Sequence, residues 1–87
     1  MKTDHLVTMA NQIGSFFESY PDQHEAATEI ANHLARFWAP RMRLALLAHV
    51  DGSNGDGLHD TVLAAIRSHR AQLMPRADFK PDLRAAA

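Results

Sequence analysis

The chain has 87 residues, which makes one small domain with room for a single hydrophobic core. Hydrophobic residues account for 46% of it, as in an ordinary globular domain, so wholesale disorder is not expected. A formal net charge of −1 lacks the basic excess of a nucleic-acid binder. The absence of cysteine excludes disulfides, thiolate metal sites, iron–sulfur clusters held by this chain and a cysteine nucleophile.

The first predicted helix covers about residues 4–20. Its large apolar residues recur at helical spacing and form one stripe, made of Leu6, Met9, Ile13, Phe16 and Tyr20 with Phe17 beside it. Thr3 or Asp4 can cap the first turn by accepting hydrogen bonds from free backbone N–H groups. Pro21 ends the helix, because the residue before a proline is disfavoured in the helical region.

The second predicted helix starts at the capping box Asp22-Gln23-His24-Glu25, in which Asp22 caps the first turn and Glu25 reaches back to it. The apolar stripe of this helix consists of Ala27, Ile30, Ala31, Leu34, Phe37 and Trp38. Pro40 then either opens a new helix at its first position or kinks a continuing one.

The third predicted helix, residues 41–50, is apolar on more than one side, so the fold or a partner must cover it. The turn-forming residues 51–57 predict a loop, and residues 60–73 predict a fourth helix. The stripe of the fourth helix consists of Val62, Ala65, Ile66, His69 and Leu73. The core is expected to contain Ile13, Phe16, Ile30, Leu34, Leu46, Ile66 and Leu73.

These elements predict an all-α fold: a small bundle of three to four short helices with a flexible C-terminal tail. The helical domain is expected over residues 1–74 and the tail over residues 75–87, where two prolines interrupt any helical period.

Patterns typical of metal sites fail at a required position. Glu25, Glu29 and His33 line up at helical spacing, but three or four converging ligands are needed for zinc, and a solvated helix face is the simpler interpretation. The loop that begins at Asp51 resembles a calcium loop until its twelfth position, which is Val62 instead of a glutamate. We therefore predict no bound metal or cofactor in this chain.

Catalysis by the chain itself is not expected either. Ser15, Ser53 and Ser68 lack the sharp turn or glycine frame that exposes a nucleophilic serine. The glycines of the loop do not follow a strand, so they do not form a phosphate-binding cradle. We predict no catalytic residue.

The segment Arg36–Arg43 combines three arginines, two large aromatic residues and a methionine around a proline, with no acidic residue. Arg, Trp and Met are enriched where proteins bind one another. Phe37 could equally belong to the core. We expect this segment to bind an acidic patch of a partner protein, through Arg36, Trp38, Pro40, Arg41, Met42 and Arg43. A binding site for RNA phosphates is an alternative.

Two segments resemble a known family: Met9-Ala-Asn-Gln-Ile-Gly-Ser-Phe-Phe17 and Ile30-Ala-Asn-His-Leu-Ala-Arg-Phe-Trp-Ala-Pro-Arg-Met-Arg43. They are similar to the delta subunit of the NAD-dependent, molybdenum-containing formate dehydrogenases of bacteria. The resemblance covers about residues 6–73. His59 and Asp60 stand where the family pattern would have a serine cap followed by proline.

The resemblance implies a non-catalytic accessory subunit of a cytoplasmic formate dehydrogenase complex. In such a complex a large subunit holds a molybdenum–pterin centre and iron–sulfur clusters, and further subunits bind FMN and reduce NAD. The implied partners are the large catalytic subunit and, through it, the FMN- and NAD-binding subunits, with neither nucleic acid nor membrane involved. Support of assembly or stability is our hypothesis for the role of the chain.

Two other functions stay open from the sequence. One is a free-standing helical regulator that binds nucleic acid through Arg36, Arg41 and Arg43, and an enzyme is the third. A cytoplasmic location is expected, because the first residues lack the apolar run and small-residue cleavage site of a signal peptide.

Overall fold

The computed structural model describes residues 2–75 of the chain, and these contain five α-helices and no strand. The helices are α1 (Thr3–Phe17), α2 (Gln23–Phe37), α3 (Pro40–Ser53), α4 (Asp60–Ser68) and α5 (Arg70–Leu73). The predicted all-α fold is therefore confirmed. The predicted fourth helix is divided in two at His69, and the predicted tail lies, except for Pro75, outside the described residues.

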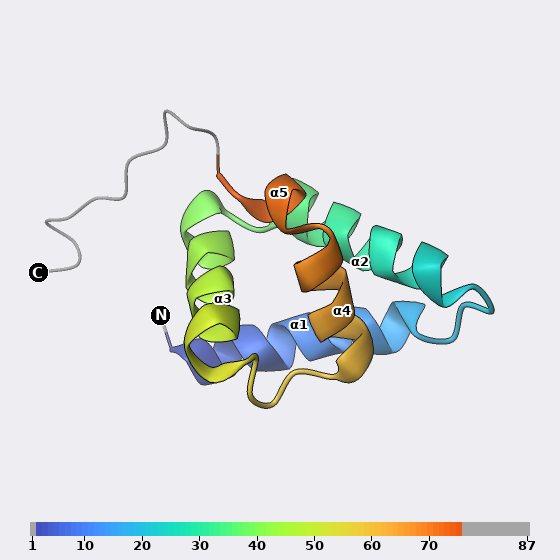
Figure 1. Ribbon diagram of the computed structural model, residues 1–87, viewed down its shortest axis with the longest axis horizontal. Helices are drawn as coiled ribbons and strands as arrows, with labels where there is room; N and C mark the ends of the chain where they lie inside the picture. The colour runs from blue at the N-terminus through green and yellow to red at the C-terminus, as the bar shows by residue number, and fades with distance from the viewer. Residues whose placement is uncertain (1, 76–87) are drawn as a thin grey trace, which may run out of the picture.

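Helices α1 and α2 are joined by a short turn and diverge from it, and α4 packs on both (Figure 1). Helix α3 contacts one end of α1, and the short α5 packs on α2 beside α3. The core at their junction consists mainly of aliphatic side chains, the largest fully buried ones being Leu6, Ile30, Leu34, Leu46, Val62, Ile66 and Leu73. No helix in residues 2–75 is long and apolar enough to cross a membrane.

Local signals explain most of the helix ends. The Asp22 carboxylate accepts hydrogen bonds from the backbone N–H groups of His24 and Glu25, which confirms it as the cap of α2. Pro40 occupies the first turn of α3, where its missing N–H costs nothing. Helix α3 ends at Asn54, which adopts the left-handed conformation (φ 58°) that asparagine tolerates better than most residues.

Three predicted boundaries are wrong. Helix α1 ends at Phe17, three residues before the predicted end at Tyr20. Thr3 and Asp4 lie inside α1, whose N-cap is Lys2 without a side-chain hydrogen bond. Residues 51–53 belong to the last turn of α3 instead of the loop. The intrinsic turn preference of a single Asp-Gly-Ser run does not outweigh propagation of a helix whose Leu46, Leu47 and Val50 are buried.

The apolar stripe predicted for α1 is rotated from the face that is actually buried. The buried residues of α1 are Leu6, Ala10 and Gly14, and Ile13 packs at the edge of the core. Phe16, predicted in the core, is 70% exposed, so that prediction is wrong. Small residues face the neighbouring helices because they allow a close approach of the backbones, and this leaves the larger residues of α1 outside.

Candidate protein-binding site

Large apolar side chains lie exposed along α1 and at the end of α2. Phe16 is 70% exposed, Phe37 69% and Met9 40%. Phe37 was predicted to belong to the buried apolar stripe of the second helix, and its exposure shows that this prediction is wrong. The other members of that stripe are buried. Single exposed apolar residues are common on monomers, but several at one place mark a binding surface.

Phe16 and Met9 border an open hollow of about 450 Å³ between α1 and α2. The residues that line it are mostly apolar: Met9, Gln12, Ile13, Phe16, Phe17, His33 and Trp38. Helices α3, α4 and α5 contribute none of them. We call this hollow, together with Phe37 at its rim, the α1–α2 groove. Concave, largely apolar sites with a few polar groups are typical of ligand and partner binding.

Aromatic contacts fix the shape of both walls of the groove. On α1 the rings of Phe16 and Phe17 meet edge to face with centroids 4.9 Å apart, and Tyr20 continues the row at 5.5 Å from Phe17. On α2 the rings of His33 and Phe37 lie 4.8 Å apart, and the Arg36 guanidinium carbon is 5.9 Å from the Phe37 ring centroid. Pairs of this geometry favour particular ring orientations. These contacts join neighbouring rings within each wall of the groove.

Two exposed arginines stand in the sequence on either side of Trp38, which lines the groove. Arg36 and Arg41 are exposed, and within residues 2–75 neither is within ion-pair distance of a carboxylate. In contrast, Arg70 forms an ion pair with Asp51, with N–O distances of 2.9 and 2.7 Å. The lining itself contains no Asp, Glu, Lys or Arg.

The structure separates the six residues predicted to bind a partner. Arg36 and Arg41 are exposed, whereas Trp38 is 6% exposed and forms part of the groove floor. Met42 packs against the core, and Arg43 turns toward α5, where its Nη1 donates to the Leu73 carbonyl at 3.4 Å. Pro40 is half-buried. That these six residues form one docking surface stays a prediction. Of the six, Arg36 and Arg41 are the exposed ones.

The groove was missed by sequence reasoning because its two walls come from different helices. A signal was nevertheless present: α1 carries more large apolar residues than one core-facing stripe can bury. The structure assigns Leu6, Ala10 and Gly14 to the core and leaves Met9 and Phe16 to the groove.

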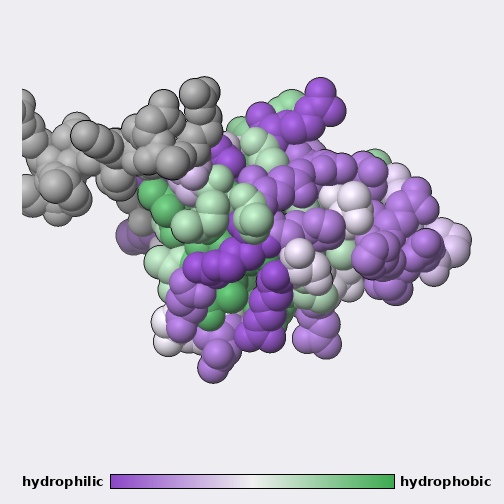
Figure 2. Space-filling model, turned by 45° about the horizontal axis from the view of Figure 1, so that its top comes forward, coloured by the Kyte–Doolittle hydropathy of each residue, from purple (hydrophilic) through white to green (hydrophobic). Residues whose placement is uncertain are grey.

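The apolar third helix does not add a comparable site. Leu46, Leu47 and Val50 are buried by the fold itself, while Leu44 and Ala45 are half-buried. Figure 2 shows hydrophobic residues gathered toward the α3 end of one face, interrupted by hydrophilic ones, whereas the end at the α1–α2 turn is hydrophilic. The core therefore covers part of the apolar surface of α3, and no residue of α3 lines the groove.

A contact between His49 and Ser53 at the end of α3 stabilises the local structure. The Ser53 Oγ lies 3.1 Å from His49 Nδ1 and donates to the His49 carbonyl at 2.8 Å. The other ring nitrogen, Nε2, faces the Asp56 carbonyl at 2.7 Å instead of an orienting carboxylate. These bonds tie the end of α3 to the loop that follows, and they do not form a nucleophile–base–acid arrangement.

The possible metal ligands of α2 do not converge. Glu25 is exposed, and the His33 ring lies against Phe37 in the groove. Across residues 2–75, no three His, Asp or Glu side chains come together as metal ligands. The prediction that the chain binds no metal stays a prediction for the protein as a whole.

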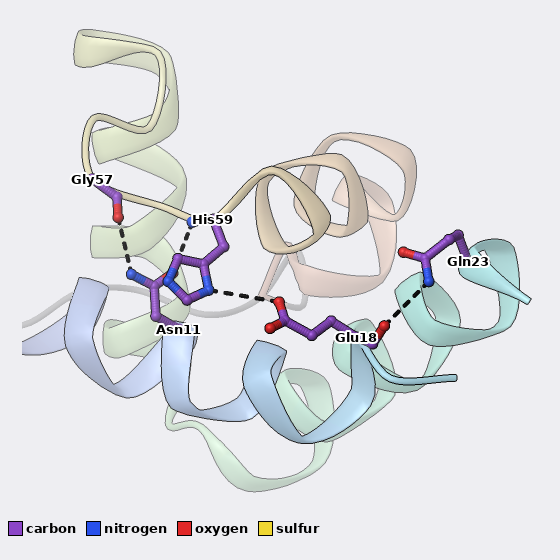
Figure 3. A network of polar contacts seen from close by, with 5 residues as sticks. All are labelled: Asn11, Glu18, Gln23, Gly57 and His59. Atoms are coloured by element: carbon purple, nitrogen blue, oxygen red, sulfur yellow. Dashed lines mark hydrogen bonds and ion pairs between the residues drawn. The ribbon is translucent and has the colours of Figure 1, made fainter. Parts of the chain in front are cut away.

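A polar clamp holds the α3–α4 loop on α1. The Asn11 side chain donates to the Gly57 carbonyl and accepts from the His59 backbone N–H, both at 2.9 Å (Figure 3). The His59 ring also faces the Glu18 carboxylate at 3.8 Å. This network fixes α4 against the side of α1 that faces the core, and it leaves the groove side open.

A scan against protein families matches residues 5–66 to the family described as NADH-dependent formate dehydrogenase delta subunit FdsD. The match covers more than half of the chain and includes every residue that lines the groove. Searches of curated proteins and of solved structures found no match.

Proposed function

The chain belongs to the family of NADH-dependent formate dehydrogenase delta subunits, and from this membership we propose that it is a non-catalytic accessory subunit of such a complex. In the proposed role it binds the large subunit that carries the molybdenum–pterin and iron–sulfur centres, in the cytoplasm, and supports assembly or stability of the complex. The FMN- and NAD-binding subunits associate with the chain through that large subunit.

The observation that carries the proposal is the exposure of Phe16 and Phe37 beside an apolar groove. A small domain that presents such a surface gains free energy by burying it against another protein, at roughly 25 cal/mol per Å² before the costs of association. The Ser53–His49 pair also lacks an orienting carboxylate, because His49 Nε2 faces the Asp56 carbonyl. Both features support a binding role over a catalytic one.

The alternative of a nucleic-acid regulator is less well supported. It requires Arg36, Arg41 and Arg43 to present a joint positive surface to phosphates. Arg43 is instead half-buried and directed at the backbone of α5. Of the two remaining arginines, Arg36 lies beside Phe37 at the rim of an apolar groove, which suits a protein partner better than a phosphate backbone.

Co-expression of the formate dehydrogenase subunits with and without this chain tests the proposed function. We expect the chain to co-purify with the large subunit in a fixed ratio, as measured by native mass spectrometry. Omission should lower the yield of assembled complex or shorten its half-life on dilution. A complex that assembles and persists equally well without the chain, and never retains it, would exclude the accessory role.

A further inference from the structure

We propose that the α1–α2 groove, with Arg36 and Arg41 at its end, is the surface that docks a segment of the large subunit bearing large apolar side chains next to carboxylates. This inference rests on the proposed function and specifies its contact surface. The docking surface proposed from the sequence was the segment Arg36–Arg43, whereas the groove is formed by residues of both α1 and α2.

The apolar part of the occupant follows from the lining. Of the seven side chains around the hollow, Gln12 and His33 are the polar ones, and the rest are apolar. A volume of about 450 Å³ accommodates two or three large side chains, since ligand pockets of roughly 300–1,000 Å³ enclose drug-sized groups. Phe16 and Phe37 stand at its edges, where an inserted apolar side chain would cover both rings.

The carboxylates expected in the partner segment are inferred from two arginines that form no ion pair within residues 2–75. Arg36 lies over the Phe37 ring at 5.9 Å, so its guanidinium stands at the rim of the groove. Arg41 is exposed in the first turn of α3, three residues after Trp38, which lines the groove. Neither arginine meets a carboxylate within residues 2–75. A partner carboxylate at this end would complete a charge-assisted hydrogen bond beside an apolar contact, an arrangement common at binding hot spots.

A second copy of the chain is a poorer occupant on the same grounds. Two copies paired through this groove would leave Arg36 of each protomer beside a lining that offers no carboxylate. Burying an arginine at an interface without a carboxylate partner opposes association. Self-association is therefore an outcome that the test must separate from docking of the large subunit.

Site-specific cross-linking tests the inference directly, because the chain has no cysteine of its own. A Phe16→Cys variant labelled with a benzophenone maleimide is mixed with the purified large subunit and irradiated. The matched control is Ala64→Cys on α4, which is exposed and lies outside the groove lining. We expect cross-links from position 16 to a large-subunit peptide that contains apolar residues and Asp or Glu, and none from position 64.

Affinity measurements complete the test. A Phe16→Ser, Phe37→Ser double variant should bind the large subunit at least ~30-fold more weakly, the loss typical of a hot spot. Arg36→Glu with Arg41→Glu should weaken binding by about tenfold or more. Met74→Ser and Arg67→Glu, which change an exposed methionine and an exposed arginine outside the groove lining, serve as matched controls and should bind like the wild type.

The possible failures are distinguishable. If the wild type binds the large subunit and the groove variants, folded by circular dichroism, bind equally well, the groove inference is overturned and the proposed function stands. If position 16 cross-links mainly to another copy of the chain, the occupant is wrong. If the wild type does not bind the large subunit at all, the proposed function itself fails.

Discussion

Gly14 of α1 lies directly against Val62 of α4: a Cβ placed on Gly14 would be closer than 3.0 Å to Val62 Cγ2. Val62 is fully buried and cannot move without disturbing the core. We therefore expect Gly14→Ala to lower the free energy of unfolding by about 1–3 kcal/mol through overpacking, despite the ~1 kcal/mol that alanine gains over glycine in a helix. Urea denaturation followed by the fluorescence of Trp38, the one tryptophan of the chain, measures the change.

Two variants control this prediction. Gly52→Ala lies in α3, where a Cβ would meet nothing within 4 Å, and should raise stability by about 0.5–1 kcal/mol. Adding Val62→Ala to Gly14→Ala should give a positive coupling, because the smaller side chain relieves the clash. A Gly14→Ala protein as stable as the wild type would show that α1 and α4 are not in this close contact.

The Asn11 clamp gives a second prediction. Asn11→Ala removes the hydrogen bonds to the Gly57 carbonyl and the His59 N–H, and should cost about 1–3 kcal/mol at 0.5–1.5 kcal/mol per bond. Thr8→Ala, which removes one exposed bond within α1, should stay within about 0.5 kcal/mol. Faster amide exchange at His59 in the Asn11 variant would accompany the loss, and unchanged exchange would contradict the clamp.

Leu34 and Phe16 form a contrasting pair that tests the assignment of core and surface. Leu34 is 0% exposed, so Leu34→Ala should cost about 2–5 kcal/mol. Phe16 is 70% exposed, and Phe16→Ala should change the free energy of unfolding by about 0.5 kcal/mol or less. Thermal denaturation of both variants measures the two changes in stability. Similar destabilisation by the two substitutions would mean that Phe16 is buried in the core.

This contrast also shows how far the sequence alone predicts the fold. Helical periodicity located all the main helices, and the Asp22 cap followed from short-range chemistry. For Pro40 the sequence left two alternatives, and the structure shows the start of a new helix instead of a kink. The face of α1 was misjudged because hydropathy ranks Phe16 above Gly14, whereas close helix packing selects small residues. Which face is buried depends on the neighbouring helix, and a single periodic stripe does not contain that information.

The candidate site was only partly predictable for a related reason. The Arg36–Arg43 segment contains the right residue types, but their directions depend on the angle between α2 and α3. That angle buries Trp38 and turns Arg43 toward α5, while Phe16, far away in the sequence, comes to the same groove as Trp38. Residues that are neighbours in the sequence therefore take different places: Trp38 lines the groove, Arg36 lies at its rim, and Arg43 contacts α5.

The orientation of Arg43 leads to a prediction that separates it from Arg41. Arg43→Glu loses the hydrogen bond to the Leu73 carbonyl and places a carboxylate near that oxygen, so it should lower stability by about 1–3 kcal/mol. Arg41→Glu, at an exposed position, should leave the melting temperature nearly unchanged. Equal melting temperatures for the two variants would mean that Arg43 is free at the surface.

Docking of the α1–α2 groove on the large subunit can be measured by hydrogen–deuterium exchange of the chain, alone and bound to the purified large subunit. We expect added protection of the amides in residues 9–17 and 33–38, with little change in α4. Protection confined to α3 and α4, with exchange in α1 and α2 unchanged on binding, would contradict it.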